Sequence, residues 1–278
     1  RRGLIPLREF ESHRFRQIQK ALIERLGLFL YQNKIAIIVY KKIQKYGELM
    51  QDLKKELETI FSFNELDLLS SDIIYSDTNN TLKSGDYYFI GFNPGGEQDR
   101  NITLRDAIQN LDRDHSIYLV PYRQHLNSGK LEKLQKRFQK LFEVLDIDPH
   151  SVFCTNLIFE ASRNISELEN ISYKINIFWK AHLKFLEIIK PKVIICNGNG
   201  PISSYSYLKS KFENHSNSQE KDFLAGHAKW KIKYCEVINN KNKYILIGLP
   251  HLSYYAPCIE NSPKRDAIES LKTLIKST

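Results

Sequence analysis

Short apolar runs alternate with helical patterns over most of the chain, from residue 86 onward. The apolar runs are Tyr88–Phe92, Val152–Leu157, Val193–Cys196 and Tyr244–Leu249. Helical patterns lie between and after them, at Lys130–Leu145, Tyr173–Ile189 and Pro263–Ile275. Continuous apolar strands separated by helices are typical of a parallel sheet that is covered by helices on both faces. We therefore predict an α/β fold over residues 86–278, a three-layer α/β/α domain with a central, mostly parallel four-stranded sheet.

The first 80 residues show a different pattern, with apolar side chains at helical spacing. This spacing begins at Phe15 in FRQIQKALIERLGLFLYQ and continues through IAIIVYKKIQKYGELMQDLKKELETI. The polar segment Ser70–Ser84 is rich in turn-forming residues and is typical of a linker. We predict an N-terminal helical region over residues 1–80 that precedes the α/β domain.

Polar loops follow each of the four predicted strands. YYFIGF continues into NPGG, VFCT ends at Asn156, VIIC continues into NGNGP, and YILIGL continues into PHLSYY. The carboxyl ends of parallel strands meet at one edge of a sheet, and ligands bind there. We therefore expect Asn93, Asn156 and His251 to lie at one site.

These three side chains fit the hydrolysis of an N-glycosidic bond. An amide carbonyl orients a water, a second amide reads the edge of a base, and a histidine donates to an oxygen that gains negative charge. The reaction needs all three functions, because the base leaves as an anion while a water attacks the sugar. Each residue also has an ordinary alternative: a turn former at Asn93, a helix N-cap at Asn156 and a structural histidine at His251.

The same segments resemble motifs of the uracil-DNA glycosylase superfamily. GFNPGG is similar to the Gly-x-Asn-Pro-Gly first motif of its mismatch-specific/thymine and single-strand-selective branches. HLSYY, His251–Tyr255, stands where the superfamily usually has His-Pro-Ser, and VFCTN resembles the strand whose terminal Asn contacts the flipped base. FWKAHLKFLEIIKPKVIICNG resembles a helix that leads through Lys-Pro into a strand. The likeness runs from Tyr87 to the C-terminus, with the motifs in order.

The resemblance implies a monofunctional DNA glycosylase that needs no metal or cofactor and acts on a base rotated out of the helix. Asn93 would position the attacking water and His251 would stabilise the leaving base, which makes these two the catalytic residues. The residues expected to contact the base are Asn156, Phe92 and Tyr118. The residues expected to contact DNA are Gly95, Gly96, Ser253, Tyr254, Tyr255 and Asn199.

Several of these assignments have alternatives. Tyr118 lies in HSIYLVPYRQH, which is equally typical of a core strand, and either Tyr254 or Tyr255 would fill the gap left by the flipped base. Asn199 belongs to a Gly-rich loop that suits a phosphate or a simple turn. Arg100, Arg105 and Arg123 suit phosphate contacts or a solvated surface.

The chain departs from the family pattern in ways that bear on rate and substrate. A neutral Asn93 stands where the fast uracil branches have a carboxylate, so we expect slower chemistry, with Glu97 and Asp99 as candidate bases. Leu252 replaces the usual proline, and a polar insertion covers Phe212–Lys229. The target is therefore left open between uracil and a bulkier modified pyrimidine, including a hypermodified phage cytosine in anti-phage defence.

Composition agrees with a nucleic-acid partner. Of the 278 residues, 41 are Lys or Arg and 32 are Asp or Glu, which gives a net charge of +9, and there are 15 Tyr and 15 Phe. Cations neutralise phosphates and aromatic rings stack on bases, although a solvated basic surface would give the same numbers. No apolar run approaches the roughly 18 residues that span a membrane. We expect a cytoplasmic monomer that binds DNA and no membrane.

The cysteines do not form a metal-binding pattern. Cys154, Cys196, Cys235 and Cys258 are widely separated and include no CxxC pair. We expect buried free thiols and neither a metal site nor an iron–sulfur cluster.

Two other classes of function remain open on the sequence. One is a binding module that recognises damaged or single-stranded DNA without cleaving it, or that traps it covalently through His251. The other is an enzyme of nucleotide metabolism that uses the open sheet, which a preference for free nucleosides over DNA would reveal.

Overall fold

The computed structural model describes residues 34–99, 101–122, 128–213, 219–239, 242–260 and 262–278. By its internal contacts the chain forms two compact units, residues 1–53 and residues 54–278. The described residues of the first unit belong to helix α2 (Lys34–Ile60), whose last residues belong to the second unit. This helix was predicted from the spacing of apolar residues, whereas the part of the prediction that begins at Phe15 lies outside the described residues.

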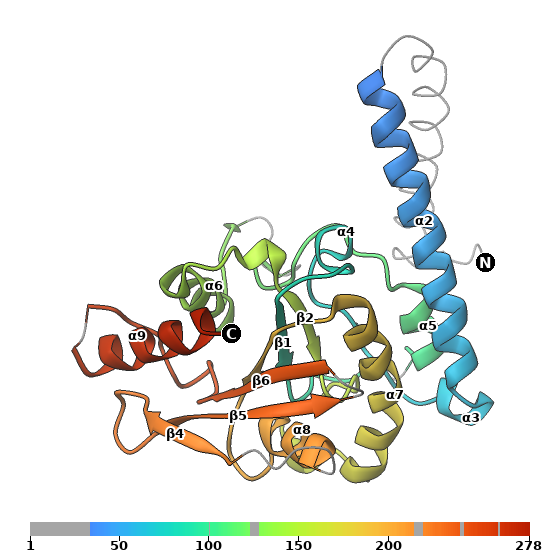
Figure 1. Cartoon of the computed structure of the whole chain (residues 1–278). Coiled ribbons are helices and arrows are strands. Elements are labelled where there is room, and N and C mark those ends of the chain that lie inside the picture. Colours follow the sequence, from blue (N-terminus) through green and yellow to red (C-terminus); the bar gives the residue numbers. More distant parts are fainter. Residues whose placement is uncertain (1–33, 100, 123–127, 214–218, 240–241, 261) are drawn as a thin grey trace. The chain divides into compact units, whose positions relative to one another are not determined.

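The second unit alternates strands and helices along the chain (Figure 1). Its strands are β1 (Tyr87–Gly91), β2 (Phe153–Asn156), β3 (Val193–Asn197), β4 (Lys221–Leu224), β5 (Lys231–Asn239) and β6 (Asn242–Leu249). Its helices are α3 (Phe63–Leu66), α4 (Thr78–Thr81), α5 (Leu104–Gln109), α6 (Lys133–Leu145), α7 (Ile171–Ile189), α8 (Ser204–Glu213) and α9 (Ser262–Lys276), with short 3₁₀ turns η3 (Pro149–Ser151) and η4 (Ile165–Glu167). Among the helices that the structure describes, none combines the length and the apolar character needed to cross a membrane.

The strands form one six-stranded sheet in the order β2-β1-β3-β6-β5-β4. The four strands predicted from apolar runs are the parallel ones, β2, β1, β3 and β6. Strands β5 and β4 extend the sheet in the antiparallel direction. The α/β class is therefore confirmed, but the prediction of four strands is wrong, because a hairpin in and after the polar insertion adds two more.

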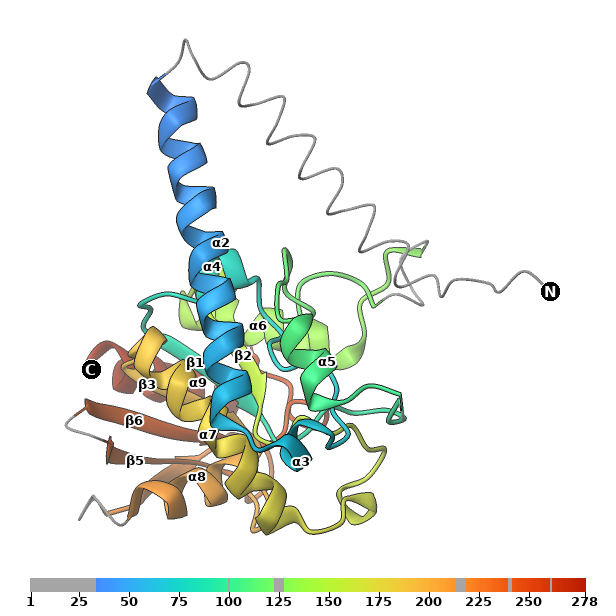
Figure 2. The ribbon, with the colours of Figure 1, turned by 90° about the vertical axis from the view of Figure 1, so that its right-hand side faces the viewer.

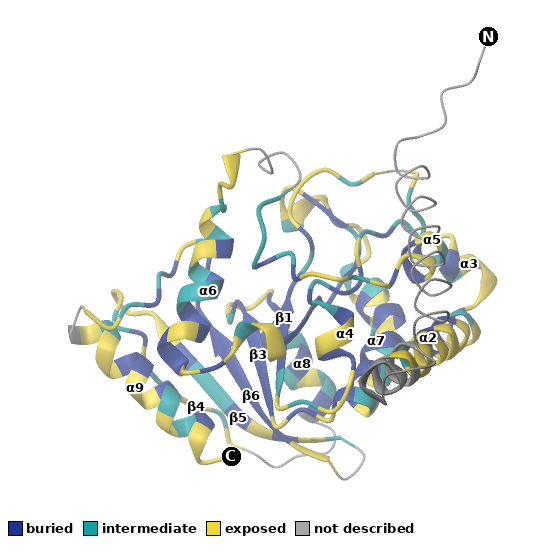
Figure 3. Ribbon diagram, turned by 90° about the horizontal axis from the view of Figure 1, so that it is seen from above, coloured by how far each residue is buried: buried dark blue, intermediate teal, exposed yellow. Residues whose placement is uncertain are grey.

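Helices cover both faces of the sheet, with α6 and α9 on one face and α7 and α8 on the other (Figure 3). The alternation of side chains in β1 shows the two layers. The Phe89 ring lies 5.0 Å from the Phe138 ring of α6, and the hydroxyl of Tyr88 lies 2.9 Å from Nδ1 of His182 in α7. Helix α8 packs beside β5 and β6 (Figure 2). Burial on both faces explains why the parallel strands are mostly apolar.

The polar segment predicted as a linker covers the outer edge of β2. Ile74 pairs with Thr155, and the N–H of Tyr75 donates to the carbonyl of Cys154 at 2.8 Å. The N–H of Cys154 donates in turn to Oγ of Ser76 at 3.0 Å. An uncovered edge strand exposes unpaired backbone groups. Residues 74–76 therefore supply partners for this edge and belong to the core of the larger unit.

The cysteines are free thiols. Cys154, Cys196 and Cys235 are buried and Cys258 is half-buried. Burial raises the pKa of the Cys154 and Cys196 thiols, so these groups stay protonated and behave as small apolar side chains. The prediction of buried free thiols is confirmed for three of the four.

Candidate active site

Polar side chains follow the carboxyl ends of four adjacent parallel strands. Asn156 ends β2 opposite Gly91 of β1, and Asn197 ends β3 opposite Leu249 of β6. Asn93 and His251 each stand two residues beyond the ends of β1 and β6, respectively. Because neighbouring strands lie about 4.8 Å apart, the row spans roughly 14 Å. The topology thus brings the three predicted residues to one edge and adds Asn197, which was not predicted.

The side-chain amide of Asn93 has a fixed orientation. Its Nδ2 donates to the carbonyl of Pro94 at 2.9 Å, to Oγ of Ser162 at 2.9 Å and to the carbonyl of Glu160 at 3.4 Å. Backbone carbonyls only accept, so the NH₂ group must face them. Oδ1 points the other way, and no donor among the residues that the structure describes reaches it. This oxygen is free to accept a hydrogen bond from a water.

The loop after β2 holds Asn93 in place. Ser162 is buried, its N–H donates to the carbonyl of Pro94 at 3.0 Å, and it forms a parallel bridge with Gly95. Its hydroxyl is one of the three acceptors for the Asn93 amide. Sequence reasoning missed Ser162, because it lies 69 residues from Asn93 and belongs to no motif.

Gly91 makes room for the predicted base-reading amide. Asn156 is 4% exposed, and a methyl group at Gly91 would lie 2.1 Å from its Oδ1. The Leu157 N–H donates to the Gly91 carbonyl at 2.9 Å, which extends the β1–β2 pairing past the strand. A glycine is therefore required at the end of β1, because any side chain would occupy the place of the Asn156 amide.

His182 in α7 is buried and supports the backbone just after the end of β2, at Leu157. Nε2 of His182 lies 3.2 Å from the Leu157 carbonyl, and the Tyr88 hydroxyl lies 2.9 Å from Nδ1. Because the carbonyl only accepts, the proton is on Nε2 and Nδ1 accepts from the hydroxyl. Burial lowers the pKa of His182 to about 4, so the ring is neutral at pH 7. His182 lies in a helical apolar pattern, which carries no functional signal.

The imidazole of His251 is half-buried and held by its own loop. The N–H of Ser253 donates to Nδ1 at 3.1 Å, and Nε2 lies 3.3 Å from Nδ2 of Asn197. Burial lowers the pKa of His251. A backbone N–H pointing at Nδ1 makes this nitrogen the acceptor, so the neutral ring carries its proton on Nε2. His251 thus offers an N–H donor, as a leaving base would require.

Leu252 anchors this loop through two backbone hydrogen bonds, one of which a proline could not make. Its N–H donates to Oδ1 of Asn197 at 2.8 Å, and its carbonyl accepts from Nη1 of Arg137 at 2.8 Å. Its side chain is fully buried in the core. Proline lacks the backbone N–H. Leu252, where the resembled motif has proline, thus gives the loop a backbone hydrogen bond to Asn197 in place of a rigid ring.

The two tyrosines after Ser253 have different environments. Tyr254 is 73% exposed, whereas Tyr255 is 1% exposed and its hydroxyl donates to the carbonyl of Ala225 at 3.0 Å. Tyr255 is therefore a core residue, and its predicted DNA contact is not supported. Tyr254 keeps the predicted role as the side chain available to enter a base stack. Ser253 is half-buried, and its backbone N–H is used by His251.

Tyr118 also lies in the core. It is 4% exposed, and its ring stacks on Phe138 with 4.5 Å between centroids. The packing alternative thus describes Tyr118, which lies in a turn and presents no open face to a base. Phe92 is buried too, but it stands at the strand end, with its ring 5.9 Å from that of Tyr207 in α8. Its contact with a base stays a prediction.

Of the remaining predicted DNA contacts, Gly95 and Gly96 are open to a ligand, whereas the Asn199 side chain is bonded within the protein. Gly95 and Gly96 are exposed, with open space at the Cβ position, and Gly96 has a φ of +112°. Nδ2 of Asn199 donates to the carbonyls of Lys231 and Gly248, at 2.7 and 2.8 Å. Asn199 therefore joins the loop after β3 to β5 and β6, which is the turn role considered above.

Of the candidate bases and arginines, the described Glu97, Asp99 and Arg105 contact partners other than Asn93. Glu97 forms an exposed ion pair with Arg163, and Oδ1 of Asp99 accepts from the N–H of Asn101 at 3.0 Å. Arg105 lies over the ring of Phe63 in α3, 5.4 Å from its centroid. Arg100 and Arg123 lie outside the described residues.

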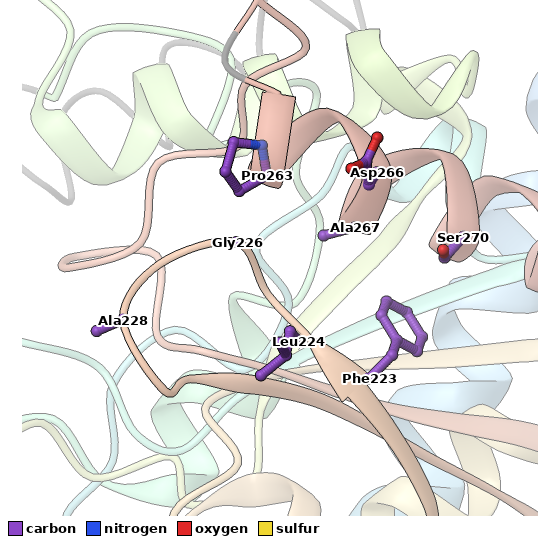
Figure 4. A pocket seen from close by; sticks show the side chains of 8 residues that line it. All are labelled: Phe223, Leu224, Gly226, Ala228, Pro263, Asp266, Ala267 and Ser270. Atoms are coloured by element: carbon purple, nitrogen blue, oxygen red, sulfur yellow. The ribbon is translucent and has the colours of Figure 1, made fainter.

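A surface hollow of about 470 Å³ lies between β4, the following loop and α9 (Figure 4). It is lined by Phe223, Leu224, Gly226, Ala228, Pro263, Asp266, Ala267 and Ser270. Asp266 is the one ionisable side chain in this set, and none of the predicted site residues belongs to it. The chemistry of the candidate site therefore belongs to the polar row at the strand ends.

Comparison with protein-family models finds no match for this chain, and comparison with curated proteins finds none either.

Proposed function

We propose that this protein is a monofunctional DNA glycosylase that hydrolyses the bond between deoxyribose and a flipped pyrimidine, leaving an abasic site. Oδ1 of Asn93 holds the attacking water, Asn156 contacts the edge of the base, and Nε2–H of His251 donates to the base as it leaves. These roles follow the resemblance to the uracil-DNA glycosylase superfamily. The pyrimidine is uracil or a modified base such as a hypermodified phage cytosine.

One observation carries the proposal: the oriented amide of Asn93. An ordinary turn residue would satisfy both ends of its amide or leave it to solvent. Here three acceptors fix the NH₂ group, and the carbonyl oxygen is directed away from them. A fixed acceptor at the end of a central parallel strand is what a water nucleophile needs, because orientation reduces the entropy cost of attack.

A DNA partner agrees with the surroundings of the site. Tyr254 is largely exposed beside His251, at 6.0 Å between ring centroids, so it can enter the space that a flipped base leaves. Open backbone at Gly95 and Gly96 allows close approach of a strand. The net charge of +9 favours a polyanion.

The test is alkali-revealed strand breakage on a panel of DNA substrates. The panel contains uracil in single and double strands, thymine and uracil mismatches, and phage DNA with glucosylated hydroxymethylcytosine. We expect breaks in at least one substrate and a loss of about 10²-fold or more in kcat for His251→Ala, since a donor to developing charge is removed. Tight DNA binding without abasic product would instead favour the binding module, and turnover of free nucleosides alone would favour nucleotide metabolism.

Gly91→Ala is expected to lower kcat/KM for abasic-site formation by about 100-fold. The new methyl group would lie 2.1 Å from Oδ1 of Asn156, and the surrounding residues are buried, so the Asn156 amide must move. A displacement of about 1 Å in a positioning group is enough for such a loss. The measurement is single-turnover and steady-state kinetics on the best substrate of the panel.

The matched control is Gly200→Ala, in the loop after β3. No atom lies within 4 Å of the Cβ position of Gly200, so this variant should keep wild-type kinetics. Unchanged kinetics in Gly91→Ala as well would show that the position of Asn156 does not matter for catalysis.

A further inference from the structure

Asn197 and His251 present two N–H donors to each other. Oδ1 of Asn197 must face the N–H of Leu252, 2.8 Å away, because that backbone group can only donate. The NH₂ end of the amide therefore faces Nε2 of His251 at 3.3 Å. Nδ1 of His251 faces another obligate donor, the N–H of Ser253, so the neutral ring has its proton on Nε2.

Two donors side by side cannot satisfy each other, but one acceptor oxygen between them would satisfy both. A protonated imidazole does not resolve the contact, because it would place a donor against a donor at Nδ1 as well as at Nε2. Asn197 is 3% exposed, so its NH₂ group has little access to bulk solvent as an alternative partner. Buried donors of this kind need an acceptor.

We propose that Nδ2 of Asn197 and Nε2 of His251 form a two-donor site for a single oxygen, the carbonyl oxygen beside the glycosidic nitrogen of a pyrimidine. This inference rests on the proposed glycosylase activity and makes Asn197 a further catalytic residue. It also makes a carbonyl next to the glycosidic bond a requirement for the substrate.

The reaction step explains why this oxygen needs two donors. The C1′–N bond breaks and both of its electrons stay with the base, whose negative charge spreads onto the carbonyl oxygen. The oxygen of the water held by Asn93 forms the new bond to C1′, and the proton that this water releases balances the anionic base. Donors placed in advance at a developing oxyanion lower the barrier, each by about 10²- to 10³-fold in rate.

Asn197→Asp separates the two functions of this side chain. The carboxylate keeps an acceptor for the N–H of Leu252, so the His251 loop stays anchored, but it replaces the Nδ2 donor with an acceptor. We expect kcat on the best panel substrate to fall about 100-fold, with KM within about threefold of wild type. The kcat–pH profile should change too, because a carboxylate beside the ring favours protonated His251.

Asn170→Asp, at the N-terminal end of α7, is the matched control, since it adds the same charge at an exposed position whose side chain makes no capping hydrogen bond. It should keep the wild-type kcat and pH profile. Asn197→Ala removes the anchor and the donor together. Near-normal kcat in Asn197→Asp with a loss only in Asn197→Ala would reduce Asn197 to an anchor and overturn the proposal.

A measurement on the wild-type protein does not depend on how the variants fold. ¹⁵N chemical shifts of the His251 ring should show a proton on Nε2 and a bare Nδ1 at pH 7. A proton on Nδ1 would mean that Nε2 accepts from Asn197, and the donor pair would not exist. Wild-type protein that forms no abasic site on any panel DNA would overturn the proposed function and the catalytic role of Asn197 with it, whatever the tautomer.

Discussion

Asn93→Asp is expected to lower kcat for abasic-site formation by about 10³-fold, even though a carboxylate is the residue that the fast uracil branches carry in this motif. Basicity alone would predict a faster reaction for Asn93→Asp, because a carboxylate is a better base than an amide. The surroundings of Asn93 decide the outcome, since they are built for an NH₂ group.

The Asn93 amide donates to two backbone carbonyls, those of Pro94 and Glu160, at 2.9 and 3.4 Å. An ionised Asp would place an oxygen against both carbonyls, and acceptors facing each other repel. The ionised side chain must then rotate out of position, so that it no longer directs a free oxygen at a water. Loss of both orientation and a correctly placed acceptor accounts for the size of the effect.

Single-turnover kinetics of Asn93→Asp, with thermal unfolding as a check on folding, test this expectation. Ser162→Ala makes a smaller change at the same place, because it removes one of the three acceptors of the Asn93 amide and leaves the two carbonyls. We expect this variant to lose about tenfold in kcat. Asn170→Asp controls for the added charge. An Asn93→Asp enzyme as fast as wild type, or faster, would show that the loop accommodates a carboxylate and that our account of the amide is wrong.

The central part of the fold follows from the sequence because its strands are buried on both faces. Val193–Asn197 is buried at every position, and its first four residues form an apolar run that is easy to recognise. Strand β5 was missed because it alternates exposed and buried residues, and its Lys and Glu side chains resemble a polar insertion. Strand β4 is a short, mostly exposed edge strand whose existence depends on pairing with β5.

The residues of the candidate site likewise fall into those that were predicted from the sequence and those that were missed. Asn93, Asn156 and His251 were found because each follows a strand directly, and the topology of a parallel sheet brings such positions to one edge. Asn197 and Ser162 were missed because their roles depend on contacts 54 and 69 residues away in the chain.

The assignments of Tyr118 and Tyr255 are not supported, for a related reason. Tyr118 and Tyr255 stand near polar loops, and an aromatic ring in that setting suits a base or the core equally well. Only the packing of the whole domain decides between them, since burial is a property of residues that are distant in sequence.

The second large effect is on stability: lowering the pH from 7 to 5 should reduce the free energy of unfolding by about 2 kcal/mol through His182 alone. The pKa of His182 is about 4 in the folded protein, because burial disfavours the charged ring, against 6.5 for an exposed histidine. Below pH 6.5 the unfolded chain therefore binds a proton that the folded protein excludes. The contribution is fully present above pH 6.5 and is lost as the pH falls towards 4, where the total reaches about 3 kcal/mol.

No charged group faces His182 to offset this cost among the residues that the structure describes. Its neighbours are the Tyr88 hydroxyl, the Leu157 carbonyl and the rings of Phe159, Trp179 and Phe185. Because Nε2 supports the backbone just after Asn156, acid should also disturb the end of β2 that carries Asn156, the residue proposed to contact the base. Loss of activity and loss of stability are then expected in the same pH range.

Urea unfolding of wild type and His182→Gln at pH 7 and pH 5 measures how much His182 contributes to the pH dependence of the free energy of unfolding. Glutamine keeps an amide donor for the Leu157 carbonyl but does not titrate, so the variant should be less stable than wild type at pH 7 and lose about 2 kcal/mol less on acidification. His150→Gln, at an exposed position in η3, is the matched control for the exchange of histidine for glutamine itself. Equal slopes in wild type and His182→Gln would mean that the ring takes up a proton in the folded protein, and hence that the Tyr88–His182–Leu157 contacts open readily. In that case the rigid support of Asn156 would have to come from the Gly91 contact alone.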